Sequence, residues 1–387
     1  MRAIVILLIL SWCVTASLAQ QTSASPPDAA KTVIQTGSGT SNQNGDRSSG
    51  DAGNQPSQDS VPELPGAKVL VLKPTDRLPQ RYDSYYEDLS KPELPPNMRP
   101  EGASLGIAKG DGFTSELVEL QWRELDNIDV YVIKPANVKK PPAILYLYSY
   151  PSTNEMYKDS KTCQFLTKDG FAAVGFVSAL TGHRFHDRPQ RQTFITELRE
   201  SLGASTHDVQ MILNYLEHRG DLDMTRVGVW GDGSGASIAI MAAAVDPRIK
   251  VLDLLDPWGD WPDWMAKSSL VPEKQRANFL QPGFLESVKN LDPLKWLPQL
   301  KTQQVRLQYI KQGITVTPAT VMERMEVAAP SNVKIVDYHD EKEFFTEVAS
   351  KGAGFDWIKQ RLQDASLLRS QVQKEAKTSS WQSSQRQ

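Results

Sequence analysis

The stretch VGVWGDGSGASIAIMAAA, Val227 to Ala244, decides the fold of this 387-residue protein. It begins as a short apolar strand, passes through a turn that contains three glycines, and continues as a helix of small and apolar residues. A strand that turns sharply into a helix has the shape of an elbow that presents a nucleophile at its apex. The stretch therefore predicts a strand–turn–helix unit, and it raises the question of which residue occupies the apex.

The glycine spacing answers that question. In a G-x-S-x-G elbow the serine stands midway between two glycines, because the backbone doubles back and leaves little room on either side. Gly231 and Gly235 have this spacing, and Gly233 stands between them. A frame with Ser234 at the apex would put Asp232 in a crowded position. We therefore predict Gly233 at the apex, no nucleophile in the turn, and Ser234 as a hydroxyl bonded to backbone at the helix start.

Apolar strands and helical segments alternate on both sides of the elbow. Strands are predicted at 117–122, 128–134, 143–149, 171–178, 226–230, 249–255, 305–310 and 333–338. A hairpin followed by β–α alternation indicates an α/β fold with an eight-stranded, mostly parallel sheet and helices on both faces. Residues 270–300 are predicted to form a small helical insertion after the sixth strand. Ligands on such sheets bind at the carboxyl ends of the strands.

The two ends of the chain differ from its middle in composition. The first residues combine a basic Arg2, an apolar core and a small-x-small cleavage site, which is typical of a secretory signal peptide. The predicted parts are a signal peptide at 1–19, a disordered low-complexity linker at 20–60, a proline-rich irregular arm at 61–116, an α/β domain at 117–362 and a polar tail at 363–387. The protein is therefore expected to be exported, to a periplasm or out of the cell.

The composition argues against several classes of partner. The net charge is −3 and no basic run is present, so nucleic acid is not an expected partner. No further segment is long and apolar enough to span a membrane. A single cysteine, Cys163, remains after the signal peptide, so no internal disulfide is expected. His183, His186 and Asp187 form one short cluster without the further ligands that a metal site needs, and we expect neither a metal nor another cofactor.

The runs on either side of the elbow carry a family resemblance. They are HDVQMILNYLEHRGDLDMTR before it and SIAIMAAAVDPRIK from its helix onward. With the elbow they resemble the α/β-hydrolase superfamily, nearest to its acetyl-xylan-esterase, dienelactone-hydrolase and prolyl-oligopeptidase-like branch. The resemblance covers about residues 117–362 and implies a secreted relative of carboxylic-ester hydrolases and serine peptidases. It also implies a serine nucleophile, a histidine base, an acid and two backbone N–H groups that stabilise an oxyanion.

The three side chains of that site have no chemical counterpart in this sequence. The resemblance places the nucleophile at Gly233, the acid at Thr315 in QGITVTP, and the base at Glu343 in YHDEKEFF. A lone serine hydroxyl without an adjacent base is a weak nucleophile. We therefore predict a catalytically inactive protein that is retained for binding or structure, with a glycine apex that leaves room for a ligand.

Four residues are predicted to shape the pocket or its oxyanion hole. The N–H groups of Tyr150 and Ser234 are the candidate oxyanion donors, His183 lies on the loop after the fourth strand, and Trp258 follows the sixth. The three tryptophans Trp258, Trp261 and Trp264 recur at helical spacing, which favours one packed face over a platform that stacks on a sugar.

Two further hypotheses remain open at this point. The first is an active esterase or peptidase with a displaced triad, in which Ser234 is the nucleophile, His339 the base and Asp256 the acid. The second is a carbohydrate-binding protein that uses the tryptophans. A small-molecule ester, a peptide or a carbohydrate is the ligand that these hypotheses allow, and the sequence leaves the oligomeric state open.

Overall fold

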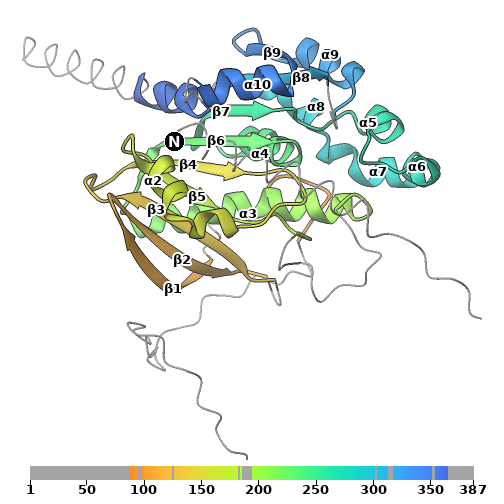
Figure 1. Ribbon diagram of the computed structural model, residues 1–387. Coiled ribbons are helices and arrows are strands. Elements are labelled where there is room, and N and C mark those ends of the chain that lie inside the picture. The colour runs from red at the N-terminus through yellow and green to blue at the C-terminus, as the bar shows by residue number, and fades with distance from the viewer. Residues whose placement is uncertain are drawn as a thin grey trace, which may run out of the picture.

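The computed structural model describes residues 87–364, apart from 95–97, 99, 124–125, 182–183, 185–193, 301–302, 313–316 and 351–353. In this part of the chain helices cover a central sheet (Figure 1). The predicted signal peptide, the predicted linker, the first part of the predicted arm and nearly all of the predicted tail lie outside the described residues. No helix among the described residues is long and apolar enough to cross a membrane.

The nine described strands form one mixed sheet in the order β1-β2-β3-β5-β4-β6-β7-β8-β9. Their bounds are β1 (Glu101–Gly110), β2 (Phe113–Gln121), β3 (Ile128–Pro135), β4 (Pro142–Leu147), β5 (Ala172–Gly175), β6 (Asp223–Asp232), β7 (Ile249–Leu255), β8 (Gln304–Gln312) and β9 (Lys334–Asp340). The pairs from β1 to β5 are antiparallel. The pairs from β5 through β4 to β9 are parallel. All eight predicted strands are present, and the prediction of a mostly parallel α/β sheet is confirmed.

The ninth strand, β1, lies in the segment that we expected to be an irregular arm. Every residue of β1 before Gly110 is exposed. The strand therefore has no buried face, and burial of apolar side chains does not hold it in place. Backbone pairing with β2, from Glu101 opposite Gln121 to Gly110 opposite Phe113, holds it in the sheet.

Helices cover both faces of the sheet (Figure 1). They are α2 (Ser160–Thr167), α3 (Leu198–Arg219), α4 (Ser234–Val245), α5 (Trp261–Lys267), α6 (Glu273–Phe279), α7 (Pro282–Val288), α8 (Pro293–Trp296), α9 (Ala319–Ala328) and α10 (Glu341–Phe345), with helical residues also at 356–364. Apolar side chains of α3, α4, α9 and the segment from α5 to α8 pack on one face of the sheet. Side chains of α2 and of 356–364 pack on the other face. The insertion predicted at 270–300 is helical and contains α6, α7 and α8.

A buried network of charges joins segments that are far apart in the sequence. Arg123, after β2, donates to both carboxylate oxygens of Glu87 at 2.7 Å each and to Asp208 of α3 at 2.7 Å. Arg184, after β5, donates to Asp126 at 2.6 and 2.9 Å and to Asp208 at 2.8 Å. Asp208 is fully buried between the two guanidinium groups, which share the three carboxylates Glu87, Asp126 and Asp208.

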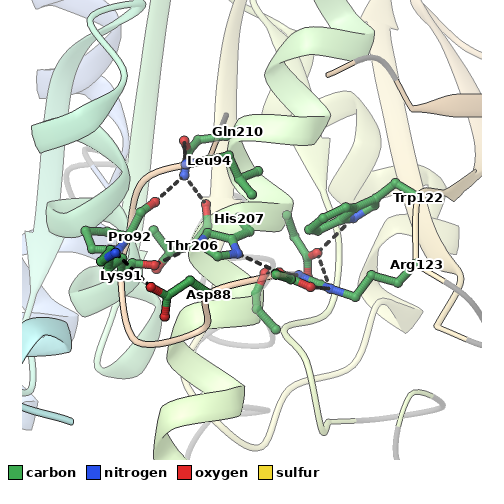
Figure 2. Close-up of polar contacts among 12 residues, drawn as sticks. Asp88, Lys91, Pro92, Leu94, Trp122, Arg123, Thr206, His207 and Gln210 are labelled. Carbon is green, nitrogen blue, oxygen red and sulfur yellow. Dashed lines mark hydrogen bonds and ion pairs between the residues drawn. The ribbon is translucent and has the colours of Figure 1, made fainter. Parts of the chain in front are cut away.

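The same network attaches the segment before β1 to α3 (Figure 2). The ring of His207 lies between two oxygens, with Nδ1 2.5 Å from Glu87 Oε1 and Nε2 2.8 Å from the carbonyl oxygen of Lys91. One turn further along α3, the amide of Gln210 donates to the carbonyl of Pro92 at 2.6 Å. Polar contacts with one face of α3 therefore position this segment.

Asp208→Asn is expected to lower the free energy of unfolding by about 3–5 kcal/mol, because it removes the fully buried charged partner that both guanidinium groups contact. Urea unfolding of the two proteins measures the difference. The control is Asp88→Asn, whose exposed ion pair with Lys91 is expected to contribute less than about 1 kcal/mol. Equal losses in the two variants would contradict the role assigned to the buried network.

Candidate functional site

The elbow lies at the carboxyl edge of the sheet, between β6 and α4. Gly233 is the single residue between the end of β6 and the start of α4. It has φ 53° and ψ −117°, a backbone conformation that glycine adopts without strain from a side chain. Its N–H donates to the carbonyl of Leu255, the last residue of β7, at 2.9 Å. The apex of the turn is therefore Gly233, and Ser234 is the first residue of the helix.

The glycines on either side of the apex are required by close backbone contacts. A Cβ atom on Gly231 would lie 2.7 Å from Cα of Ala236. A Cβ atom on Gly235 would lie 2.1 Å from the carbonyl oxygen of Leu147, at the end of β4. The helix start thus packs directly on the neighbouring strands, which explains the spacing of the two glycines in physical terms.

The space beside the apex is filled by other side chains of the protein. A Cβ atom on Gly233 would lie 2.2 Å from Oγ and 2.9 Å from Cβ of Ser149, and 3.0 Å from Nε1 of Trp258. The expectation that a glycine apex leaves room for a ligand is therefore wrong. Ser149 and Trp258 occupy the volume into which a side chain of residue 233 would project.

Both candidate oxyanion donors are bonded to serine hydroxyls. The N–H of Tyr150 donates to Oγ of Ser234 at 2.9 Å, and the N–H of Ser234 points to Oγ of Ser149 at 3.4 Å. Ser234 is fully buried. The two N–H groups that would stabilise an oxyanion thus have partners within the protein.

Aromatic side chains cover the elbow. Phe194 is fully buried and stacks on Tyr150, with ring centroids 5.2 Å apart, and meets Trp258 edge to face at 6.1 Å. Trp258 in turn lies 4.8 Å from Trp264, and Trp261 packs edge to face on Trp264. All three tryptophans are buried, as one packed face, and none of them presents an open ring for stacking on a sugar.

Asp256 follows β7 in a left-handed conformation, with φ 43°. Its carboxylate accepts the N–H of Ile310 at 3.0 Å. Burial, together with the nearby charge of Asp232, raises its pKa to about 8. Burial also raises the pKa of Asp232 to about 7. An acid that orients a catalytic histidine must be ionised, and at neutral pH Asp256 holds its proton.

The candidate bases lie at the edge of the sheet. His339 is in β9 and is exposed. Its backbone N–H donates to the carboxylate of Glu343, and the N–H of Glu343 donates to Asp340 at 2.8 Å. Asp340 therefore caps the start of α10, and the carboxylate of Glu343, at the family position of the base, is bonded to the backbone of His339. Thr315 and His183 lie outside the described residues.

The structure does not bring the displaced triad together. Among the described polar contacts, Ser234 bonds to Tyr150 and Ser149, and Asp256 to backbone and Thr317. No described hydrogen bond joins Ser234, His339 and Asp256 to one another. Sequence reasoning missed Phe194 and the contact of Ser149 with the apex, because both depend on segments that meet only in the folded chain.

The strand order, the glycine elbow and the flanking helices can be compared with known proteins. Acetyl xylan esterase 1 from Thermoanaerobacterium sp. superposes with a TM-score of 0.50 at 14% identity, over 62% of this chain and 81% of the esterase. This chain has the α/β-hydrolase fold. An acetyl xylan esterase from Paenibacillus sp. R4 gives a TM-score of 0.50 at 15% identity, over 67% of this chain and 88% of that enzyme.

Two sequence comparisons agree with this α/β-hydrolase fold. Residues 128–252, which include the elbow, match the dienelactone hydrolase family. An acyltransferase from Aspergillus calidoustus is 26% identical over 144 residues, which make up 37% of this chain and 44% of the acyltransferase. The matched part thus spans less than half of that protein. The resemblance to the α/β-hydrolase superfamily is confirmed, and the activity has to be argued from the site.

Gly233→Ala is expected to lower the free energy of unfolding by about 2–4 kcal/mol, because it adds left-handed strain and a clash with Ser149. Gly112→Ala is the matched control. Gly112 also has a positive φ, 79°, but an added Cβ atom meets nothing within 4 Å. Ser149→Gly in the Gly233→Ala background is expected to restore part of the loss, and its failure to do so would contradict the crowding. Thermal and urea unfolding measure all four proteins.

Asp256→Asn is expected to stabilise the protein above about pH 5, and increasingly up to pH 8. The unfolded chain releases this proton near the ordinary pKa of 3.8, whereas the folded chain keeps it to about 8, so the group makes stability fall as pH rises through this window. Asparagine keeps the acceptor oxygen for Ile310 and suits a positive φ. At pH 8 the gain is expected to be about 1–3 kcal/mol.

Unfolding of wild type and Asp256→Asn between pH 4 and pH 9 measures this effect, with the exposed Asp111→Asn as control. Parallel pH profiles of the wild type and Asp256→Asn would contradict the protonation state assigned to Asp256.

Proposed function

We propose that this chain is a non-hydrolysing protein of the α/β-hydrolase fold, of the esterase and dienelactone hydrolase type, that is retained for binding or structure. The observation that carries the proposal is the apex of the elbow. Gly233 offers no nucleophile, and Ser149 and Trp258 fill the volume that a nucleophilic side chain would need. Acyl transfer on this fold depends on a side chain projecting at this point.

The surroundings of the apex support the same proposal. The two candidate oxyanion donors point to serine hydroxyls at 2.9 and 3.4 Å. Phe194, Tyr150 and Trp258 form an aromatic cover over them. A carbonyl group that entered would have to displace both hydroxyls and part of this cover. We therefore propose that this protein binds its ligand or partner at a surface other than the filled elbow.

Two observations count against the other hypotheses, which are the displaced triad and carbohydrate binding through the tryptophans. A displaced triad would require Ser234, His339 and Asp256 to meet, and it would require an ionised Asp256, whose pKa is raised by burial to about 8. The names of the two acetyl xylan esterases of similar fold give a carbohydrate ester as their substrate. Carbohydrate binding through the tryptophans would require buried rings to become exposed.

The first 19 residues support a further part of the proposal, export across a membrane. Expression of the full chain with its leader in a secreting host, followed by intact-mass measurement, tests it. Cleavage after Ala19 would give a chain that begins at Gln20. Recovery of the uncleaved chain in the cytoplasm alone would count against export.

Labelling with a fluorophosphonate, read by intact mass and peptide mapping, tests the lack of a nucleophile. The purified wild type is expected to show no adduct and no hydrolysis of p-nitrophenyl acetate above buffer, since Gly233 has no nucleophilic side chain and the described hydrogen bonds of Ser234 include no base. Gly233→Ser is expected to remain unlabelled, because a serine hydroxyl without an adjacent base is a weak nucleophile. A known acetyl xylan esterase is the positive control. A stoichiometric adduct on Ser234 would overturn the proposal and favour the displaced triad.

A further inference from the structure

The outer edge of β1 is the open end of the sheet. β1 pairs with β2 on one side, and no described strand pairs with it on the other. All residues from Glu101 to Lys109 are exposed. Two large apolar side chains lie among them, Leu105 at 51% and Ile107 at 64% exposure. Such an edge presents a row of backbone N–H and C=O groups that can extend a sheet.

β1 has one of the features by which proteins usually prevent pairing at an edge, a bulge at Leu105, but its centre lacks two others, charge and proline. Its central residues, GASLGIA from Gly102 to Ala108, contain no charge and no proline. The opposite edge differs, because β9 exposes one large apolar side chain, Ile335, beside the charged or polar side chains of Lys334, Asp337 and His339. The two edges of the sheet are therefore not equivalent, and β1 is the edge that is suited to adding a strand.

We propose that two copies of this chain pair antiparallel through β1, around a two-fold axis at Leu105. This register places Glu101 opposite Lys109, Gly102 opposite Ala108, Ala103 opposite Ile107, and Ser104 opposite Gly106. A two-fold axis produces each of these pairs twice. The charges at the ends of β1 thus form two complementary cross-strand pairs, and the apolar side chains gather at the centre.

Charge complementarity indicates that the strand added at the edge of β1 comes from a second copy of this chain. Glu101 and Lys109 have no described ion pair within the chain, and they stand at equal distances in sequence from Leu105. The pairing of β1 with β2 skips Leu105, which is the extra residue of a bulge. A two-fold axis through Leu105 sets the bulges of the two copies opposite each other, so the register on either side stays matched. The sheet then continues across both copies.

Sedimentation velocity of the mature chain over a concentration series tests the pairing. The wild type is expected to be a dimer. Leu105→Lys is expected to be monomeric, because it places two like charges at the axis. The matched control is Val327→Lys, which changes an 88% exposed apolar side chain on α9 and is expected to leave the dimer intact. Unfolding midpoints close to that of the wild type verify that these exposed substitutions leave the fold unchanged.

Charge exchange tests the register. Glu101→Lys and Lys109→Glu are each expected to raise the dimer Kd by about tenfold or more, since each creates two like-charged cross-strand pairs. The double variant restores both pairs and is expected to return the Kd to near the wild-type value. A wild type that stays monomeric to about 100 μM, or a dimer that Leu105→Lys leaves intact, would overturn the proposal. Single variants that weaken the dimer without rescue in the double would overturn the register.

Discussion

The start of α4 lies so close to the end of β4 that no side chain fits between them. A Cβ atom on Gly235 would clash with the carbonyl oxygen of Leu147, and a Cβ atom on Gly231 would lie 2.7 Å from Cα of Ala236. This contact forces the chain to turn within one residue, Gly233, whose backbone takes a left-handed φ. The elbow, and with it the parallel sheet on which the elbow stands, depends on two glycines at a fixed spacing.

The same close packing determines what the site contains. In an elbow of this shape the apex side chain would project between the loop after β4 and the loop after β7. Here Ser149 and Trp258 come from those two loops and fill that volume. The hydroxyls of Ser234 and Ser149 accept from the N–H groups of Tyr150 and Ser234, which would otherwise lack partners in the protein. Contacts of Ser149, Ser234 and Trp258 thus occupy the place of the nucleophilic side chain that Gly233 lacks.

Two buried carboxyl groups, those of Asp208 and Asp256, are accommodated in different ways. Around α3, Asp208 lies between Arg123 and Arg184, so its negative charge is compensated. At the carboxyl edge, Asp256 faces the charge of Asp232, and burial keeps it protonated near neutral pH. Both arrangements follow from the cost of placing a charge away from water. The first fixes the segments that flank the sheet, and the second disfavours ionisation of Asp256.

Patterns among residues that are close together in the sequence determined the sheet and the glycine turn. The apolar runs predict eight strands, and the glycine spacing predicts Gly233 at the apex, because periodicity and backbone crowding act within a few residues. Tertiary structure alone decided three other features. Strand β1 has no buried face and is ordered by β2, Ser149 reaches the apex across 84 residues, and Asp208 meets Arg123 across 85. Such contacts join segments whose proximity no local pattern encodes, so only the folded chain reveals that the site is filled.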